Sequence, residues 1–188
     1  MDRLLVLGGA AFDVLHLEDR TVESVGGGGM YTAMAAHRSG AQVALFGLRP
    51  EPCPDSLQPV ARRLTEWLGP VVSPAQIMQF EISYRGGKTE YLNRSFGAAN
   101  ILSPTMLPAD LSVYDFIHVT PLGGAEMQLA FVQACRERGA QQISCGTDLV
   151  VAENQTQAVR AVMELSDYFF MNDVEIQAVF GSLEAAKT

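Results

Sequence analysis

The chain has 188 residues, of which 48% are hydrophobic and 18% are charged. This length and composition suit one globular domain with a sizeable core and exclude a disordered chain. The formal net charge of −8 argues against nucleic acid or an anionic membrane surface as the main partner.

The cysteines and the start of the chain indicate the compartment. The 3 cysteines are scattered and form no CxxC pair, which fits buried thiols in a reducing compartment better than a disulfide framework. The first residues lack the flanks of a signal peptide, and no apolar run approaches the ~18 residues of a membrane span. We therefore expect a cytoplasmic protein without a membrane partner.

The chain begins with a strand and a hairpin. Leu4–Leu7 is a continuous apolar run that stops at two glycines, which is typical of a buried parallel strand. Apolar and polar residues then alternate on both sides of a polar turn at 18–20. This pattern predicts a hairpin at about 12–25 with one partly wet face.

A run of four glycines follows, Gly26, Gly27, Gly28 and Gly29, and leads directly into a segment with helical periodicity. Glycine lets a ligand approach the main chain closely, and the first amides of a helix have no internal partner and carry the positive end of its dipole. A flexible linker is the alternative, but glycines that abut a well-patterned helix favour a ligand cradle. The helix is expected to end at Gly40, before a strand at Gln42–Phe46. Its core side is expected to carry Met30, Ala33, Met34 and His37.

The middle of the chain predicts a helix and a second hairpin. Ser56–Leu68 has helical spacing, with a core side made of Val60, Leu64, Trp67 and Leu68. Strict alternation around a two-glycine turn predicts a hairpin at about 77–96. Amphipathic hairpins do not belong in a doubly buried parallel sheet, so the two hairpins are expected to form a small side sheet, or lid.

Regular alternation of strands and helices then resumes. Strands are expected at Phe116–Val119, Gln142–Cys145 and Tyr168–Met171, and helices at Ala125–Arg138, Gln155–Leu165 and Asp173–Phe180. The helix at 125–138 is expected to bury Met127, Ala130, Phe131, Ala134 and Cys135. This order predicts an α/β fold over residues 1–188, with a mainly parallel sheet and helices on both faces. Because few residues follow the last predicted helix, the domain is expected to be C-terminally incomplete.

Two familiar nucleotide-binding motifs fail. Gly87-Lys88-Thr89 looks like the end of a phosphate-binding P-loop, but Ile82 stands where the motif needs its first glycine. The segment after the first strand is not the GxGxxG fingerprint of dinucleotide sites. A nicotinamide-dependent oxidoreductase is therefore disfavoured.

Three features point instead to one crevice at the carboxyl edge of the sheet. Asp13 lies just past the first strand, where open α/β sheets bind ligands. The glycine cradle begins a helix at the same edge, and Asn172 and Glu175 follow the last predicted strand there. A carboxylate, free amides and an Asn/Glu pair are expected to converge.

This combination resembles the ribokinase-like, PfkB-type carbohydrate kinases. Gly26-Gly27, the small-residue helix up to Arg38-Ser39-Gly40, and the strand ending at Phe46-Gly47 match the first signature of that family. The resemblance implies that the side sheet is a lid. It also implies substrate-binding residues, namely Asp13, Gly26, Gly27, Gly28, Gly29 and Tyr31, where many members have Asn in place of Tyr31. Asn172 and Glu175 match the NxxE motif that serves the phosphate and magnesium end.

The resemblance implies ATP-dependent phosphoryl transfer to a hydroxyl of a sugar or sugar-like small molecule, with ATP and Mg²⁺ as cofactors. The small-molecule partner it implies is a sugar or nucleoside substrate. The second family signature, a GAGD-type loop with the catalytic aspartate, is absent. No catalytic residue and no direct metal ligand is therefore expected in this chain, which would carry the substrate-binding half and be inactive alone. A homodimer through the lid is a further expectation.

Other readings of these residues stay open. Asp13 could be a loop carboxylate that bonds to nearby backbone, and Tyr31 could be a core residue. Asn172 and Glu175 could simply start a helix, and Asp148 is expected to be a structural turn residue. At the level of function, the alternative is a non-catalytic sugar- or nucleoside-binding relative of such kinases.

Overall fold

The computed structural model describes residues 1–187; Thr188, the last residue of the predicted domain, lies outside the described residues. At the centre is a six-stranded sheet in the order β12-β11-β10-β1-β4-β6. Its strands are β1 (Arg3–Leu7), β4 (Gln42–Phe46), β6 (Glu66–Leu68), β10 (Phe116–Val119), β11 (Ile143–Gly146) and β12 (Tyr168–Phe170). Every neighbouring pair is parallel, which confirms the predicted α/β class.

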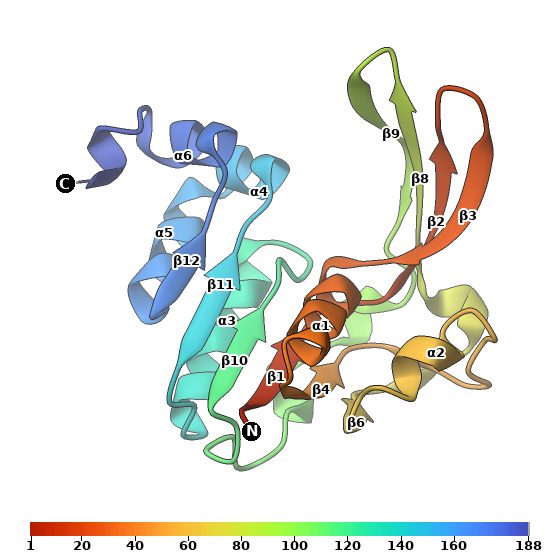
Figure 1. Ribbon diagram of the computed structural model, residues 1–188. Helices are drawn as coiled ribbons and strands as arrows, with labels where there is room; N and C mark the ends of the chain where they lie inside the picture. The colour runs from red at the N-terminus through yellow and green to blue at the C-terminus, as the bar shows by residue number, and fades with distance from the viewer. Residues whose placement is uncertain (188) are drawn as a thin grey trace.

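Helices cover both faces of this sheet (Figure 1). They are α1 (Gly28–Arg38), α2 (Gln58–Ala61), α3 (Ala125–Glu137), α4 (Leu149–Asn154), α5 (Thr156–Leu165) and α6 (Asp173–Phe180). Successive residues of a strand point to opposite faces. On β1, Val6 belongs to a buried cluster with Ala33 of α1, whereas Leu5 and Leu7 belong to one with Phe131 of α3. The helices α1 and α3 therefore cover opposite faces, as expected.

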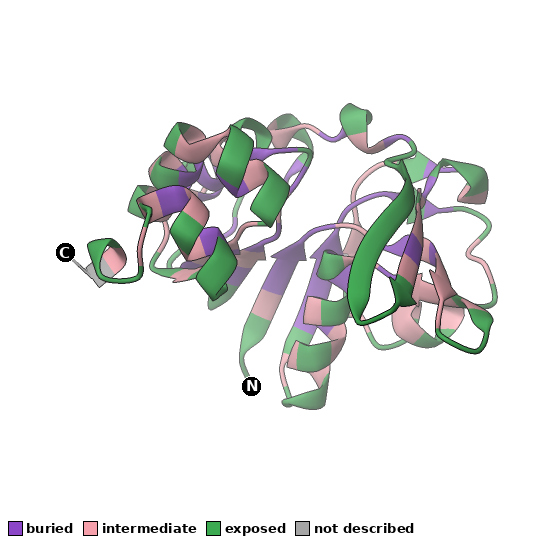
Figure 2. Ribbon diagram, turned by 90° about the horizontal axis from the view of Figure 1, so that it is seen from above, coloured by how far each residue is buried: buried purple, intermediate pink, exposed green. Residues whose placement is uncertain are grey.

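A second sheet, the side sheet, projects from this body (Figure 1). Its order is β3-β2-β8-β9, from the strands β2 (Ala11–His16), β3 (Thr21–Gly26), β8 (Met78–Arg85) and β9 (Lys88–Ser95). The hairpins β2–β3 and β8–β9 lie close to the ranges 12–25 and 77–96 expected from the sequence, and a parallel β2–β8 pair joins them. The two inner strands, β2 and β8, are only partly buried, while β9 is exposed along its whole length (Figure 2).

The remaining elements are short. Two two-residue strands, β5 (Arg49–Pro50) and β7 (Val71–Val72), pair with each other, and four 3-10 turns follow, namely η1 (Pro74–Gln76), η2 (Ala99–Ile101), η3 (Pro104–Met106) and η4 (Ala185–Lys187). None of the helices within residues 1–187 has the length and hydropathy of a membrane span.

The predicted helix at Ser56–Leu68 is wrong over most of its length. Only α2 is helical there, and Glu66–Leu68 forms the edge strand β6. Trp67 pairs in register with Leu45 of β4, and Trp67 and Leu64 pack against the cluster on the α1 side of the sheet. The apolar residues face the core as predicted, but the sheet edge offers β6 main-chain hydrogen bonds that outweigh its helical spacing.

The buried side of α3 also differs from the prediction at three positions, one of which is Ala130, which is only half-buried. Met127 is 37% exposed, whereas Gln128 is fully buried. The Gln128 amide donates to Val119 O at 3.0 Å and to Gly146 O at 2.8 Å. Gln128 thus ties the ends of β10 and β11 together, and these hydrogen bonds offset the cost of burying its Nε2 group, while within residues 1–187 its buried Oε1 has no partner. Phe131, Ala134 and Cys135 are buried as predicted.

Candidate functional site

The carboxyl ends of β1, β4 and β10 meet the start of α1 at one edge of the central sheet. The chain leaves β1 at Gly8 and β10 at Thr120, and the Thr120 hydroxyl donates to Leu7 O at 3.0 Å. Thr120 is 6% exposed and lies against Gly8 and Gly28. Thr120 was not predicted as a site residue. The feature of the sequence that could have indicated it is a polar residue directly after a buried strand.

Asp13 lies on β2 with its carboxylate against the glycine run. A Cβ added to Gly26 would lie 1.9 Å from Asp13 Oδ2, so the carboxylate occupies the space that a side chain at Gly26 would need. Asp13 is 7% exposed, and within residues 1–187 its Oδ1 has no hydrogen-bond partner. Burial raises the pKa of this carboxyl above 3.8. The alternative in which Asp13 accepts hydrogen bonds from nearby backbone therefore does not hold for Oδ1.

The four glycines have different surroundings. A Cβ on Gly29 would lie 2.4 Å from Gly8 C, and Gly27 has φ +99° with Gly9 O 2.4 Å from the position of its Cβ. Close packing of main chain against main chain therefore explains why glycine stands at positions 27 and 29, without any ligand. Gly28 is the open position, since the nearest atom to its added Cβ is Thr120 Cγ2 at 3.8 Å.

The first turn of α1 has amides available for a ligand. Gly27 is the N-cap and provides no side chain. Met30 N donates to Gly9 O at 3.3 Å and Tyr31 N to Gly27 O at 3.0 Å, but the amides of Gly28 and Gly29 find no acceptor in the described part of the chain. First-turn amides of this kind favour oxygen-rich ligands.

Tyr31 is not a core residue. Its side chain is 57% exposed, and its hydroxyl donates to Val25 O at 3.3 Å. The ring therefore stands on the surface between the first turn of α1 and the end of β3, next to the glycine run.

Asn172 and Glu175 form a capping box at the start of α6. Asn172 Oδ1 accepts from the amides of Val174 and Glu175, and Glu175 Oε2 accepts from Asn172 N at 2.9 Å. A capping box of this type satisfies amides that the helix itself leaves unpaired. The two residues also line a shallow hollow of about 370 Å³ together with Phe169, Phe170 and Met171.

Asp13 and Asn172 lie at the same sheet edge without meeting. Asp13 lies on β2, which the chain enters from the end of β1, whereas Asn172 comes just after β12. The strands β1 and β12 are three positions apart in the sheet order, so at the usual strand spacing their ends are separated by roughly 14 Å. The structure therefore brings together Asp13, the glycines and Tyr31, and leaves Asn172 and Glu175 as a separate group along the edge. Asp148 caps α4 by accepting from Val151 N, which confirms its structural reading.

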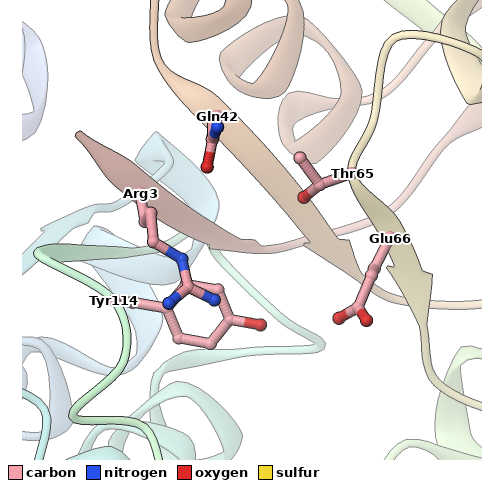
Figure 3. Close-up of a pocket in the computed structure, with 5 residues that line it drawn as sticks. All are labelled: Arg3, Gln42, Thr65, Glu66 and Tyr114. Atoms are coloured by element: carbon pink, nitrogen blue, oxygen red, sulfur yellow. The ribbon is translucent and has the colours of Figure 1, made fainter. Parts of the chain in front are cut away.

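A polar pocket of about 180 Å³ lies at the opposite edge, lined by Arg3, Gln42, Thr65, Glu66 and Tyr114 (Figure 3). Arg3, Gln42 and Glu66 each begin a parallel strand, so the pocket lies at the amino ends of the strands. Ligands of open α/β sheets bind at the carboxyl ends. The Arg3 guanidinium lies 5.5 Å from the centre of the Tyr114 ring, and the pocket joins none of the candidate site residues.

No family model and no curated protein matches the sequence, but solved structures do match the fold. A carbohydrate kinase from Agrobacterium tumefaciens aligns with a TM-score of 0.77 and 18% identity over 100% of this chain and 66% of its own. Adenosine kinase from Sinorhizobium meliloti aligns with a TM-score of 0.79 and 14% identity over 99% of this chain and 69% of its own. Ribokinase from Cryptococcus neoformans, solved with ADP, aligns with a TM-score of 0.72 and 19% identity over 97% of this chain and 61% of its own.

The chain has the ribokinase-like fold. This confirms the fold class predicted from the sequence, including the side sheet. The chain spans about two thirds of the length of these structures, from 61% to 69%. Within this ribokinase-like fold, the roles assigned to Asp13, the glycines, Tyr31, Asn172 and Glu175 stay predictions.

Proposed function

We propose that the full-length protein transfers the γ-phosphoryl group of ATP to a hydroxyl of a sugar or nucleoside, and that this chain carries the acceptor-binding half. The observation that carries the proposal is the Asp13 carboxylate, which is buried and leaves Oδ1 without a partner within residues 1–187. The fold of the solved carbohydrate and adenosine kinases supports the reaction class.

An acceptor hydroxyl supplies what the Asp13 carboxylate lacks. A buried carboxylate without a hydrogen-bond donor is costly, and a sugar or a ribose unit offers donors to it. A hydrogen bond to a charged group contributes about 1.5–3 kcal/mol. Asp13 would therefore both hold the acceptor and orient the hydroxyl for transfer, a reaction in which positioning does most of the catalysis.

The glycines and Tyr31 complete the acceptor site in this proposal. Gly26 leaves room for the Asp13 carboxylate, and Gly27 and Gly29 let α1 start directly against β1. The amides of Gly28 and Gly29 would donate to acceptor oxygens. The exposed Tyr31 ring would flank the acceptor, and its hydroxyl would give this site a different contact from the Asn found in many relatives.

ATP would supply the phosphoryl group, with Asn172 and Glu175 at the phosphate and magnesium end of the sheet edge. Their oxygens cap α6, and residues 1–187 contain no group of three metal-ligating side chains. The two residues thus do not fit as direct Mg²⁺ ligands, and we assign no step to the ion. The base that activates the hydroxyl is proposed to lie outside this chain.

The side sheet is proposed to act as a lid that excludes water, which would otherwise hydrolyse ATP. The strand β9 forms one edge of the sheet and is exposed along its length. Exposed edges pair readily with another chain, so a homodimer through this edge is part of the proposal.

ADP release by the full-length protein over a panel of sugars and nucleosides tests the function. We expect ATP turnover that depends on one acceptor class, and an Asp13→Asn variant whose kcat/KM for the acceptor falls by about 10- to 100-fold or more. Asp115→Asn is the matched control, because it removes one exposed carboxylate at the opposite sheet edge, where Asp115 Oδ2 accepts from Arg3 N. Equal activity of Asp13→Asn and Asp115→Asn would overturn the assignment.

The same assay separates the alternative, a non-catalytic binder. Saturable acceptor binding without any ADP release by the full-length protein would establish the binder. The 188-residue chain alone is expected to release no ADP, and turnover by it would contradict the placement of the base outside the chain.

A further inference from the structure

The face of the side sheet that carries Asp13 is lined by aromatic rings. Asp13 pairs in parallel register with Phe80 of β8, and paired residues of neighbouring strands point to the same face. The Phe80 ring lies 6.2 Å from the Tyr91 ring and 5.7 Å from the Phe96 ring, both in edge-on contact. An aromatic group thus begins one strand away from the unpaired carboxylate.

Around the half-buried Phe80, the other rings are exposed. Tyr91 is 47% exposed and Phe96 is 53% exposed, and Tyr84, on the same face of β8 as Phe80, is 41% exposed. Burial raises the pKa of Tyr84, and Tyr91, Asp13 and Tyr31 raise it further through their charge, so each of these three groups lies within electrostatic range of Tyr84. We call Tyr31, Phe80, Tyr84, Tyr91 and Phe96 the aromatic face.

The aromatic face already holds one planar group. The Arg94 guanidinium lies 3.9 Å from the centre of the Tyr91 ring, in a cation–π contact. Aromatic side chains and guanidinium planes are the groups on which proteins stack nucleobases. Exposed apolar patches bordered by polar residues mark binding sites, and this one borders a carboxylate that needs a hydroxyl donor.

We propose that the acceptor is a nucleoside: its base packs on the aromatic face and its ribose hydroxyl bonds to Asp13. This inference rests on the proposed function and names its substrate class. From β2 across β8 to β9 the face extends over two strand spacings, roughly 10 Å, which is longer than one monosaccharide ring. A nucleoside combines the hydroxyl that Asp13 requires with the planar group that the face accommodates.

Titration calorimetry on the full-length protein tests this with adenosine and uridine as nucleosides and ribose as the free sugar. We expect one nucleoside to bind at least 10-fold more tightly than ribose. Tyr91→Ala and Phe96→Ala should each weaken the binding of that nucleoside by about 10-fold, the usual loss for one stacked base. They should leave the affinity for ribose within about 2-fold of the wild type. Tyr168→Ala is the matched control, since Tyr168 is equally exposed, at 53%, at the amino end of β12 in the other sheet. It should change neither affinity.

Two results would overturn the proposal that the acceptor is a nucleoside and would leave the kinase proposal intact. One is a simple sugar that binds as tightly as either nucleoside, with ADP release that depends on Asp13 but not on Tyr91 or Phe96. The other is a dimer that Tyr91→Ala dissociates without changing nucleoside affinity, which would make the aromatic face a subunit contact. Circular dichroism of each variant checks that it is folded. Failure of the Asp13→Asn test would instead remove the function itself.

Discussion

At the scale of single residues, the Asp13 carboxyl should reduce the stability of the unliganded protein. Burial raises its pKa above 3.8, so the folded state binds the proton more tightly than the unfolded state. The free energy of unfolding then falls as the pH rises from 3.8 through the raised pKa, and the loss is complete above it. If Asp13 binds the acceptor as proposed, this loss of stability is the cost of holding a carboxylate ready for a ligand.

We therefore expect Asp13→Asn to melt at a higher temperature than the wild type at pH 7, with a difference that shrinks as the pH is lowered toward 4. For a chain of this size, each kcal/mol shifts the melting temperature by roughly 2–4 °C. Thermal unfolding followed by circular dichroism at pH 7, 5 and 4 measures the effect. A variant that melts below the wild type at pH 7 would show that the carboxylate has a compensating partner.

The sequence predicted that Asp13 and the glycine run lie together, because the carboxyl edge of an α/β sheet collects such residues. The sequence did not reveal why each glycine is there. The need for Gly29 arises from its contact with Gly8, which only the folded chain creates. Likewise, the position of Tyr31 in the helical pattern did not decide whether it lies in the core or on the surface, and the fold places it on the surface.

At the scale of elements, the junction of β1 and α1 gives a sharp pair of substitutions. Gly29→Ala would place a Cβ 2.4 Å from Gly8 C, where two main chains cannot separate without moving the helix, whereas Gly28→Ala meets only Thr120 Cγ2 at 3.8 Å. We expect Gly29→Ala to lose at least about 3 kcal/mol of unfolding free energy. Gly28→Ala should stay within about 1 kcal/mol of the wild type, because Ala is the better helix former.

Urea unfolding of the two variants side by side measures this difference. Each variant adds the same methyl group to neighbouring glycines, so each is the other's control. Equal stability of the two would mean that the close approach of α1 to β1 is not required.

The segment 56–68 shows where sequence reasoning fails for an element. The apolar spacing of Leu64 and Trp67 fits a helix, and both do pack on the core. The hydrogen bonds from Thr65 N to Val43 O and from Gly47 N to Leu68 O make the end of the segment a strand, and these partners lie about 20 residues away in sequence. By contrast, α6 has the predicted bounds, since Asn172 and the left-handed Gly181 cap it locally.

At the scale of the whole molecule, the alternation of strands and helices was enough to predict the α/β class and the separate side sheet. The strand order β12-β11-β10-β1-β4-β6 and the parallel β2–β8 pair join segments far apart in sequence, and no local pattern predicts them. The parallel pair sets Phe80 beside Asp13, and in the proposed site it would link the Asp13 carboxylate to the aromatic face.

The most direct test of the central claim is a crystal structure of the full-length protein with the acceptor that supports ADP release. We predict an acceptor hydroxyl within about 2.5–3.0 Å of an Asp13 carboxylate oxygen, with the acceptor lying against the first turn of α1 and beneath the side sheet. An acceptor bound elsewhere, for example in the polar pocket at Arg3 and Glu66, with no contact to the Asp13 carboxylate, would contradict it.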